Sequence, residues 1–384
     1  MVNITDKTQC SGCTACQQAC AHNAISMQRD EHGHVYPHVD TSACINCGLC
    51  DKVCPFLHKD KFSNDTLSPI TVHAVYNKDD EVRQRSTSGG VFTLLAKYVI
   101  SNGGVVFAAR FNENFSIIHD SFDNMGDIDA YRGSKYAQSN LGDTFIQIKR
   151  ELKQRLVLFV GTPCQVAGLR SFLNRDCDNL LTCDFICMGI SSQAMWKDYL
   201  KIYWSGHTIN RIFFKDKRNG WHKWRMLINY DDSKEYLTPG LQDPFFFTYL
   251  KHFSYRPSCF ECPFRHCHRV SDITIADCWG IDKIHPDFDD NKGCTAFITH
   301  SKKGEEILEN IKRNLFQIDY DINDVIFYNP YIQKPISQPD LYEFFNDEYT
   351  KYGFEKAYQS VVGENRNRKC SFLTKLIKLF LKKK

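Results

Sequence analysis

Two runs of cysteines near the start of the chain carry the strongest chemical signal in the sequence. The first run consists of Cys10, Cys13, Cys16 and Cys20. The second run repeats the same spacing with Cys44, Cys47, Cys50 and Cys54. Thiolates at this spacing converge from one tight turn, which is the arrangement that an iron–sulfur cube requires. The runs therefore predict two 4Fe-4S clusters within residues 1–58.

The ligands of each cluster follow from a rule for paired runs of the bacterial ferredoxin type. Three cysteines of one run share a cluster with the fourth cysteine of the other run. The first cluster is therefore predicted to use Cys10, Cys13, Cys16 and Cys54, and the second to use Cys44, Cys47, Cys50 and Cys20. Zinc is the alternative for Cys-x-x-Cys pairs, but a closed zinc site rarely uses two interlocked runs.

Composition limits the remaining classes of function. The 384 residues suggest two or three domains, and the formal net charge of +3 gives no indication of nucleic-acid binding. The 18 cysteines stand mostly in ligand spacings, which fits a reducing cytoplasm, and oxygen-sensitive cubes favour an anaerobic host. The start of the chain predicts no signal peptide, and no apolar stretch of about 18 residues predicts a membrane span.

Changes of pattern along the chain predict the domain organisation. Residues 1–58 form the ferredoxin module, and the polar residues 59–70 are expected to form a linker. The segments 71–155 and 156–335 form the two parts of an α/β region, and 336–384 forms a helical extension. The extension ends in a tail from Lys369 to Lys384 that is predicted to form a short basic amphipathic helix. A solvated terminal helix and peripheral contact with the inner face of a membrane are the alternatives for this tail.

Hydrophobic periodicity predicts an α+β fold with mixed α/β elements, in which the dicluster ferredoxin fold precedes the α/β region. Helices are predicted over 91–100, 145–152, 163–173 and 304–315. Strands are predicted over 73–76, 105–108, 117–119, 156–160, 180–187 and 272–277, and a β region is predicted from Ile209 to Tyr236.

A further group of cysteines suggests a third cube. Cys164 and Cys187 each follow a predicted strand, and their thiols come close if the two strands are neighbours. Cys259 and Cys262 precede a proline in a Cys-x-x-Cys-Pro sequence, which resembles half of a cluster site. Cys267 is the fifth candidate. His266 and His268 keep zinc open as an alternative here.

Three short stretches combine glycines, hydroxyls and a cation in a way that suits a cofactor. One of them precedes a predicted helix, whose N-terminus offers unpaired N–H groups to a phosphate. Another follows a buried strand, where open α/β sheets place ligands. The residues concerned are Ser88, Gly89, Gly90, Ser134, Lys135, Tyr136, Gly161, Thr162, Pro163 and Gln165.

These stretches and the segment from Arg269 to Asp277 together resemble the beta-subunit family of coenzyme F-420 hydrogenases and dehydrogenases, from about Val72 to Ile284. The plant enzyme 7-hydroxymethyl chlorophyll reductase is similar. The resemblance implies non-covalent FAD beside a third 4Fe-4S cluster. The recurrent cysteines of the family match Cys164, Cys187, Cys259 and Cys262, with Cys267 as the alternative. Two departures are Met188, where many bacterial relatives have histidine, and Cys278 within the motif around Asp277.

The resemblance implies an iron–sulfur flavoprotein oxidoreductase that passes electrons between 4Fe-4S clusters and FAD. Expected partners are a ferredoxin-type protein and a small substrate or deazaflavin coenzyme, and a homo-oligomer stays open. Some bacterial relatives are associated with surface-polysaccharide synthesis. The alternative is a non-catalytic electron-transfer subunit of a larger redox complex. No catalytic acid or base stands out, and the candidates are His119, Asp277 and Lys135.

Overall fold

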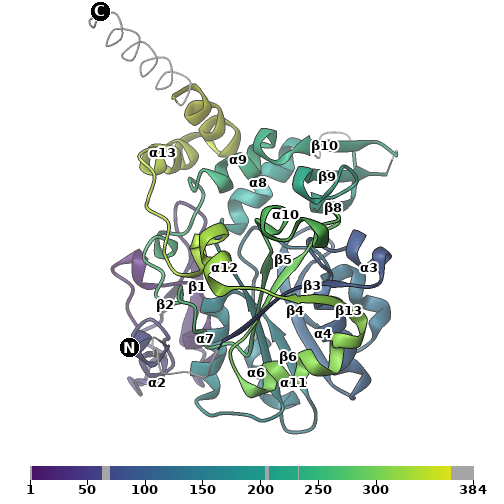
Figure 1. Ribbon diagram of the computed structural model, residues 1–384. Helices are drawn as coiled ribbons and strands as arrows, with labels where there is room; N and C mark the ends of the chain where they lie inside the picture. The colour runs from purple at the N-terminus through teal and green to yellow at the C-terminus, as the bar shows by residue number, and fades with distance from the viewer. Residues whose placement is uncertain (1, 63–69, 204–206, 232, 365–384) are drawn as a thin grey trace, which may run out of the picture.

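The computed structural model describes residues 2–62, 70–203, 207–231 and 233–364. The N-terminal module, drawn in purple, lies beside a large central sheet, and a second layer covers one end of that sheet (Figure 1). The fold is mixed α/β, as the sequence predicts.

The central sheet has eight strands in the order β13-β3-β12-β11-β7-β6-β4-β5. Four adjacent strands, β4, β6, β7 and β11, are parallel to one another. This parallel group is flanked by β5, which pairs antiparallel with β4, and by β12, which pairs antiparallel with β11. The strands are β3 (Thr71–Asn77), β4 (Val105–Phe111), β5 (Ile117–Phe122), β6 (Val157–Val160), β7 (Leu180–Phe185), β11 (Ile273–Asp277), β12 (Thr295–Thr299) and β13 (Leu315–Asp319). The parallel arrangement brings the carboxyl ends of four strands to one edge of the sheet.

Helices cover both faces of the central sheet because its buried strands are apolar on both sides. Val106 and Ala108 point to the face covered by α4 (Val91–Ser101), α5 (Ile128–Tyr131) and α11 (Lys302–Ile311). Val105 and Phe107 point to the opposite face, which is covered by α6 (Thr144–Glu151) and α7 (Pro163–Leu173). Helices α10 (Ile281–Ile284) and α12 (Ile322–Tyr328) pack against the strands β3 and β12.

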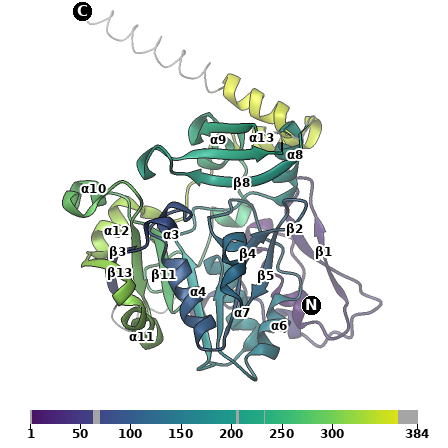
Figure 2. The same cartoon turned by 90° about the vertical axis from the view of Figure 1, so that its right-hand side faces the viewer.

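A second layer lies across the carboxyl edge of the central sheet (Figure 2). It contains a three-stranded sheet of β8 (Ile209–Asp216), β9 (Arg225–Tyr230) and β10 (Glu235–Pro239). Its helices are α8 (Gln193–Tyr203), α9 (Pro244–Leu250) and α13 (Tyr342–Tyr352), and residues 354–364 are also helical. The core of this layer is strongly aromatic, and Trp196, Phe214 and Phe245 are buried in contact with one another.

The N-terminal module consists of β1 (Ile25–Arg29), β2 (Val35–Val39), α1 (Ala15–Ala19) and α2 (Leu49–Lys52). It docks on the central domain through α1, which packs on α6 and α7. Helix α6 has no N-terminal cap of its own, and Gln18 Oε1 instead accepts hydrogen bonds from Phe145 N and Ile146 N at 2.8 and 3.3 Å. A side chain of the N-terminal module thus caps a helix of the central domain, and these hydrogen bonds hold the module against that domain.

The sequence predicted most of the central elements correctly, including α4, α6, α7, α11 and the antiparallel pair β4–β5. It did not predict α8, α9 or α12, nor the strands β12 and β13, whereas α13 lies within the predicted helical extension 336–384. Residues 63–69 of the predicted linker and the basic tail from Lys369 lie outside the described residues. Within the described part of the chain, every helix is too short or too polar to cross a membrane.

The contact between α1 and α7 depends on Gly168. A Cβ atom at Gly168 would lie 3.0 Å from both Cβ and Sγ of Cys13. We expect Gly168→Val to push the N-terminal module away from α7, because the branched side chain needs more room than this contact leaves. Limited proteolysis should then cleave the chain between the module and the central domain faster, and less iron should be retained. Ser171→Val on the same helix is the control. Equal cleavage rates and iron contents in the two variants would contradict the expectation.

Candidate redox site

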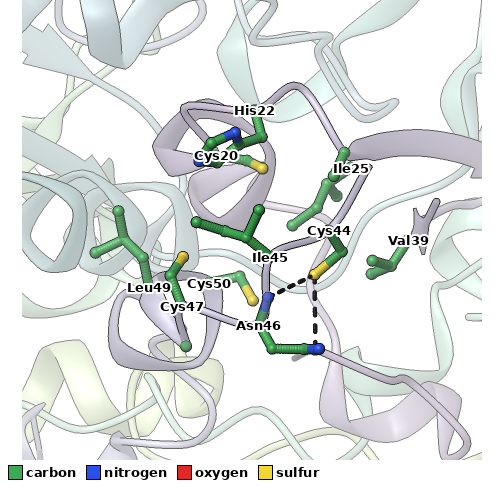
Figure 3. Close-up of a pocket in the computed structure, with 12 residues that line it drawn as sticks. Cys20, His22, Ile25, Val39, Cys44, Ile45, Asn46, Cys47, Leu49 and Cys50 are labelled. Carbon is green, nitrogen blue, oxygen red and sulfur yellow. Dashed lines mark hydrogen bonds between the residues drawn. The ribbon is translucent and has the colours of Figure 1, made fainter. Parts of the chain in front are cut away.

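The second predicted cysteine set surrounds a pocket at the surface of the N-terminal module (Figure 3). Its thiol-bearing residues are Cys20, Cys44, Cys47 and Cys50. Cys47 is exposed, and the neighbouring apolar residues Ile45 and Leu49 are 62% and 39% exposed. The backbone N–H of Asn46 donates to Cys44 Sγ at 3.5 Å. The four predicted ligands are therefore together, and they face solvent.

The first predicted cysteine set surrounds a neighbouring pocket that is lined by Cys10, Cys13, Cys16 and Cys54. The N–H of Gly12 donates to Cys10 Sγ at 3.4 Å. Burial, together with the neighbouring thiols, raises the pKa of Cys16 to about 12 and that of Cys13 further still. Thiols in such surroundings lose their protons only when metal cations replace them, so the donor set fits a metal cluster.

A third group of four thiols forms at the carboxyl edge of the central sheet. Strands β6 and β7 are parallel neighbours, so Cys164 at the start of α7 and Cys187 after β7 lie near each other. Cys259 and Cys262 come from the loop after the second layer, and Cys259 lies within electrostatic range of the other three thiols. Burial raises the pKa values of Cys164, Cys187 and Cys259, as it does in the first set.

Cys267 lies apart from this third group. Its sulfur accepts a hydrogen bond from Gln333 Nε2 at 3.2 Å, and its side chain packs with the core around α10 and α12. The zinc alternative with the neighbouring histidines gains no support. Within the described residues, Asp30, Glu31 and His32 form the group of three whose ligand atoms all lie within 4.8 Å of one another, and neither His266 nor His268 belongs to it. The Lys7 ammonium group already forms ion pairs with the carboxylates of Asp30 and Glu31, at 2.9 and 2.7 Å.

The three cysteine sets follow one another from the surface inward. Cys16 of the first set lies within electrostatic range of Cys50 of the second, and Cys13 lies within range of Cys164 of the third. A small apolar cluster of Phe56, Ala167 and Phe264 contacts cysteines of the first and third sets. The arrangement connects the exposed second set to the carboxyl edge of the central sheet through the first and third sets.

The glycine stretch after β3 lies at the same edge. Gly89 N donates to Thr295 Oγ1 at 3.0 Å, and a Cβ atom at Gly89 would lie 2.7 Å from the Val75 carbonyl oxygen. Gly90 has φ +80° and begins α4, whose N-terminus has no side-chain cap. Thr87 Oγ1 accepts a hydrogen bond from Ser134 N at 2.8 Å, which joins two of the predicted cofactor stretches. The first turn of α4 therefore offers backbone N–H groups beside both stretches.

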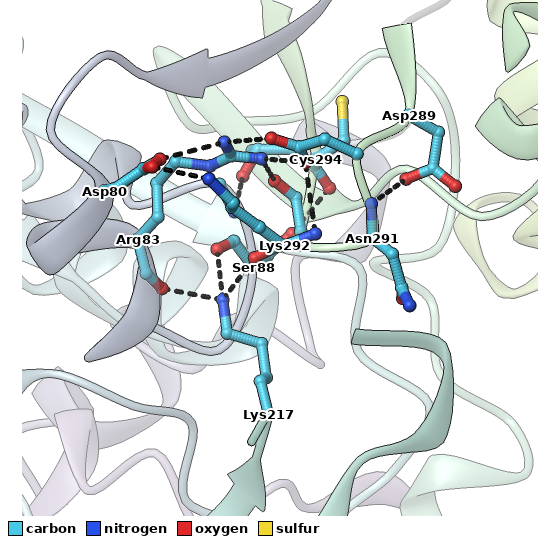
Figure 4. Close-up of polar contacts among 12 residues, drawn as sticks. Asp80, Arg83, Ser88, Lys217, Asp289, Asn291, Lys292 and Cys294 are labelled. Atoms are coloured by element: carbon cyan, nitrogen blue, oxygen red, sulfur yellow. Dashed lines mark hydrogen bonds and ion pairs between the residues drawn. The ribbon is translucent and has the colours of Figure 1, made fainter. Parts of the chain in front are cut away.

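Two lysines near these stretches are bound by carbonyl groups. Lys217 Nζ donates to the carbonyl oxygens of Ser88, Arg83 and Lys292 at 3.0, 2.6 and 2.7 Å (Figure 4). Lys135 Nζ donates to the carbonyl oxygens of Tyr131 and Arg132 at 2.9 and 3.2 Å. Neither lysine pairs with a carboxylate within the described part of the chain, and desolvation lowers the pKa of each to about 7. An anion close to either lysine would favour its charged form.

A buried ion pair stands beside this region. Lys215 Nζ lies 2.6 Å from Asp277 Oδ2 and between 5.2 and 6.0 Å from the ring centroids of Tyr136, Trp224 and Trp279. Desolvation opposes the charge on Lys215, but the Asp277 carboxylate outweighs it and raises the lysine pKa. Asp277 Oδ1 is buried and has no hydrogen-bond partner among the residues that the structure describes. Sequence reasoning named Tyr136 and Asp277 but missed Lys215 and Trp224, because β8 and β9 carry no motif.

The predicted stretch after β6 is used within the fold. Thr162 and Gln165 form a reciprocal capping box at the start of α7, and Pro163 occupies its first turn. Gln165 Nε2 also donates to Ser139 Oγ at 2.9 Å. Gly161 fits against Phe159, whose ring a Cβ would approach to 2.9 Å. These residues therefore fix the position of Cys164.

The three acid–base candidates differ in their surroundings. His119 is buried between Ser139 Oγ and the Val160 carbonyl at 2.8 and 3.0 Å, and burial lowers its pKa to about 4. It is a neutral core histidine with both ring nitrogens satisfied. Lys135 is held by carbonyls, as described above. Asp277 alone keeps a buried oxygen without a partner.

Four cysteines outside the three sets are core residues. Cys177, Cys183, Cys278 and Cys294 are all buried and free. Cys278, the departure from the family motif, packs with Cys294 in the core between β12 and α10. Cys370 lies outside the described residues.

Comparisons with known proteins agree with the sequence motifs. Residues 154–319 match the family model for the C terminus of the coenzyme F420 hydrogenase/dehydrogenase beta subunit, and residues 9–57 match the 4Fe-4S dicluster domain. The coenzyme F420-dependent sulfite reductase of Methanocaldococcus jannaschii is 28% identical over 168 residues, which are 44% of this chain and 26% of that protein. The match therefore spans about a quarter of the length of this relative.

A solved structure also matches most of this chain. It belongs to the F420-reducing NiFe hydrogenase complex from Methanosarcina barkeri, with a TM-score of 0.48 and 16% identity, and the match covers 78% of this chain and 94% of that one. The family matches confirm the predicted resemblance to the beta-subunit family over residues 154–319 and the dicluster motif over residues 9–57. They support an iron–sulfur oxidoreductase.

The positions of Cys262 and Cys267 generate a direct test of the third site. We expect Cys262→Ser to lower the iron content by up to about four atoms per chain, because its sulfur belongs to the group of four converging thiols. We expect Cys267→Ser to leave the iron content unchanged, because its sulfur faces Gln333. Iron and acid-labile sulfide should be measured after anaerobic purification. Iron loss in Cys267→Ser with full iron in Cys262→Ser would reverse the assignment.

Proposed function

We propose that this chain is an iron–sulfur flavoprotein oxidoreductase, in which three 4Fe-4S clusters connect an exposed electron-transfer surface to FAD at the carboxyl edge of the central sheet. The observation that carries this proposal is the convergence of Cys164, Cys187, Cys259 and Cys262 from separate segments, directly behind the first ferredoxin-type set. A two-cluster ferredoxin has no need of such a group in a second domain.

The proposed cluster ligands are the three sets of thiols. The first cluster would use Cys10, Cys13, Cys16 and Cys54; the second would use Cys20, Cys44, Cys47 and Cys50; the third would use Cys164, Cys187, Cys259 and Cys262. The two pockets within the module each have a predicted set in their lining, and the residues of the third set are partly buried. Thiolate sets of this kind suit iron–sulfur clusters.

The proposed FAD site lies around Ser88, Gly89 and Gly90 and the facing stretch from Ser134 to Tyr136. The uncapped start of α4 would receive the pyrophosphate, and Lys217 and Lys135 would supply positive charge near it. Gly161, Thr162, Pro163 and Gln165 were also predicted as cofactor contacts. We propose that they serve the cofactor indirectly, because their side chains already fix α7 and Cys164.

The role of the protein in this chemistry is positioning. Bound FAD exchanges two electrons with a hydride partner and single electrons with a cluster, and this conversion belongs to the cofactor. The chain contributes the order of the thiol sets and the apolar contacts between them, and the aromatic layer of β8 and β9 excludes water. Asp277, paired with Lys215, is the candidate group for holding a proton at this edge.

We propose that a small electron-carrier protein of the ferredoxin type exchanges electrons at the second set, because Cys47, Ile45 and Leu49 are exposed there. The hydride partner is proposed to be a deazaflavin coenzyme or another small hydride carrier, since the matched relative is named as F420-dependent. The association with surface-polysaccharide synthesis, the cytoplasmic location and a homo-oligomer stay predictions from the sequence.

A second candidate function is an electron-transfer subunit of a larger complex. It is favoured by the family match over residues 154–319, because the description of that family names a subunit. In that case the same three sets would pass electrons to a partner that carries the substrate site. A partner that co-purifies in equal amounts would distinguish this function from that of a self-sufficient enzyme.

The composition of the purified protein tests the proposal directly. We expect about twelve irons, about twelve sulfides and about one FAD per chain after anaerobic purification, by the stoichiometry of three cubes and one flavin. Metal and sulfide analysis and the flavin released by acid give these numbers from one sample. About eight irons with no flavin would leave a two-cluster ferredoxin fused to a domain of other function.

The pKa values of the two carbonyl-bound lysines predict how FAD affinity depends on pH. Without a bound anion, Lys217 and Lys135 have pKa values of about 7, so both are mostly neutral at pH 8 and above. A bound pyrophosphate favours the ammonium form and raises these pKa values, so binding at high pH takes up protons. The Kd for FAD should therefore rise about tenfold per pH unit for each linked lysine between pH 8 and 9.

This dependence is measured by titrating flavin-free protein with FAD at several pH values. Lys217→Gln should bind FAD more weakly at pH 7 and show a smaller slope with pH. Lys153→Gln, at an exposed lysine, is the matched control and should behave like the unmodified protein. A Kd that stays constant from pH 7 to 9 would show that neither lysine contacts the pyrophosphate.

A further inference from the structure

Arg256 is a fully buried arginine at the junction of the N-terminal module and the central domain. It is 0% exposed and lies three residues before Cys259 in the chain. Its Nε donates to the Cys10 carbonyl oxygen at 2.6 Å, and its Nη2 donates to the Val35 carbonyl oxygen at 2.9 Å. Its guanidinium also lies 4.1 Å from the centroid of the Tyr36 ring. These contacts fix the guanidinium against the loop of the first cysteine set.

The same guanidinium contacts a predicted cluster ligand directly. Nη2 of Arg256 lies 3.6 Å from Cys10 Sγ, within hydrogen-bonding distance for sulfur. Its Nη1 donates to Gln138 Oε1 at 3.3 Å, and the Gln138 amide nitrogen donates to the carbonyl oxygens of Ser11 and Gly12. Within the described residues, no carboxylate pairs with Arg256. Its positive charge is therefore not neutralised locally, and it faces the sulfur of Cys10.

The third cysteine set has a comparable neighbour. Arg265 is 7% exposed, and it interacts electrostatically with Cys187, Cys259 and Cys262. Its Nη2 donates to the Met188 carbonyl oxygen at 2.7 Å, which holds the guanidinium in place. Each of the two inner sets is thus associated with its own buried arginine.

The second, outer cysteine set has different charged surroundings. The Asp51 carboxylate lies 4.0 Å from Cys50 Sγ. The residues lining its pocket include no arginine or lysine. The outer set therefore has a carboxylate beside a sulfur and no basic residue in its pocket lining, whereas the first set has the Arg256 guanidinium against Cys10 in addition to the Asp51 carboxylate, which is within electrostatic range of Cys54. A carboxylate close to the sulfurs disfavours added negative charge, whereas a guanidinium favours it.

We propose that Arg256 raises the reduction potential of the first cluster, so that an electron from the second cluster moves inward and is held next to the third. This inference rests on the proposed function, because it needs clusters at the thiol sets. Reduction adds one negative charge and requires no proton. An N–H group directed at a ligand sulfur and a nearby buried positive charge both favour the reduced form. Arg256 therefore acts on the reduction potential of the first cluster, and Arg265 acts in the same way on that of the third.

The test is a redox titration of the full-length protein, monitored by electron paramagnetic resonance and absorbance, which resolves the one-electron waves of the clusters. In Arg256→Gln one wave should move to lower potential. At a fixed solution potential, the ratio of reduced to oxidised cluster should fall about tenfold, which equals about 59 mV for a one-electron couple. In Arg265→Gln a different wave should move. One wave, that of the second cluster, should stay unchanged in both variants.

Two further variants separate charge from structure. Arg256→Lys keeps the positive charge but loses the planar fork, so its wave should shift less than in Arg256→Gln. Arg110→Gln removes an arginine that pairs with Asp120 in the strand pair β4–β5, away from the cysteine sets, and should move no wave. Iron content is measured first in every variant. Unchanged waves in Arg256→Gln at full iron content would overturn the inference, as would an equal shift of all waves.

A measurement on the unmodified protein covers the case in which the variants lose iron. Chains grown with arginine labelled with ¹⁵N in the guanidinium should show a ¹⁵N hyperfine coupling at a reduced cluster in pulsed electron paramagnetic resonance. Absence of this coupling at every reduced cluster would contradict the contact between Arg256 and Cys10. About eight irons or fewer in the unmodified protein, with no flavin, would instead count against the proposed function itself.

Discussion

The structure depends on the burial of sulfur atoms that need positive charge close to them. Burial raises the pKa values of Cys13, Cys164 and Cys259 far above the usual range of a thiol, because a thiolate is poorly solvated there. Metal ions at the proposed ligand positions would overcome this penalty, and the buried arginines Arg256 and Arg265 add charge from the protein. The outer set lies in a surface pocket, where water contributes to the solvation of its sulfurs.

This requirement explains why the N-terminal module and the central domain share so many contacts at one place. Gly168 lets α7 approach Cys13, Gln18 caps α6, and Gln138 binds the carbonyl groups of the Cys10 loop. Arg256 reaches across the same junction. Electron transfer becomes slow as the distance between centres grows, so a loosely tethered module would interrupt the connection between the first and third sets. The close packing is therefore a functional constraint as well as a source of stability.

The sequence revealed those parts of the site that local spacing determines. The positions of Cys10, Cys13 and Cys16 follow from one turn, and the exchange of Cys20 and Cys54 follows from a general rule for paired runs. The proximity of Cys164 and Cys187 depended on two strands being neighbours, which β6 and β7 are. Arg256, Arg265 and Lys215 could not be found in this way, because their partners are distant in sequence and their own neighbours form no motif.

The same reasoning explains why one predicted cofactor stretch keeps groups available to a ligand while another does not. Ser88, Gly89 and Gly90 keep a backbone available to a ligand, since α4 starts there without a side-chain cap. Thr162 and Gln165 looked equally suitable in the sequence, but each satisfies the other across the first turn of α7. A polar side chain in a motif is thus available to a cofactor only when the fold gives it no partner, and sequence spacing alone does not decide this.

The arrangement of the central domain favours an enzyme over a passive electron carrier. A carrier needs only clusters that are close to one another and to the surface, and the N-terminal module already provides two cysteine sets for this purpose. The central domain adds a third set, two carbonyl-bound lysines without carboxylate partners among the described residues, and a buried carboxylate oxygen of Asp277 that has no hydrogen-bond donor there. Such groups cost stability unless a ligand interacts with them, so their presence together at one edge of the sheet supports the proposed FAD site.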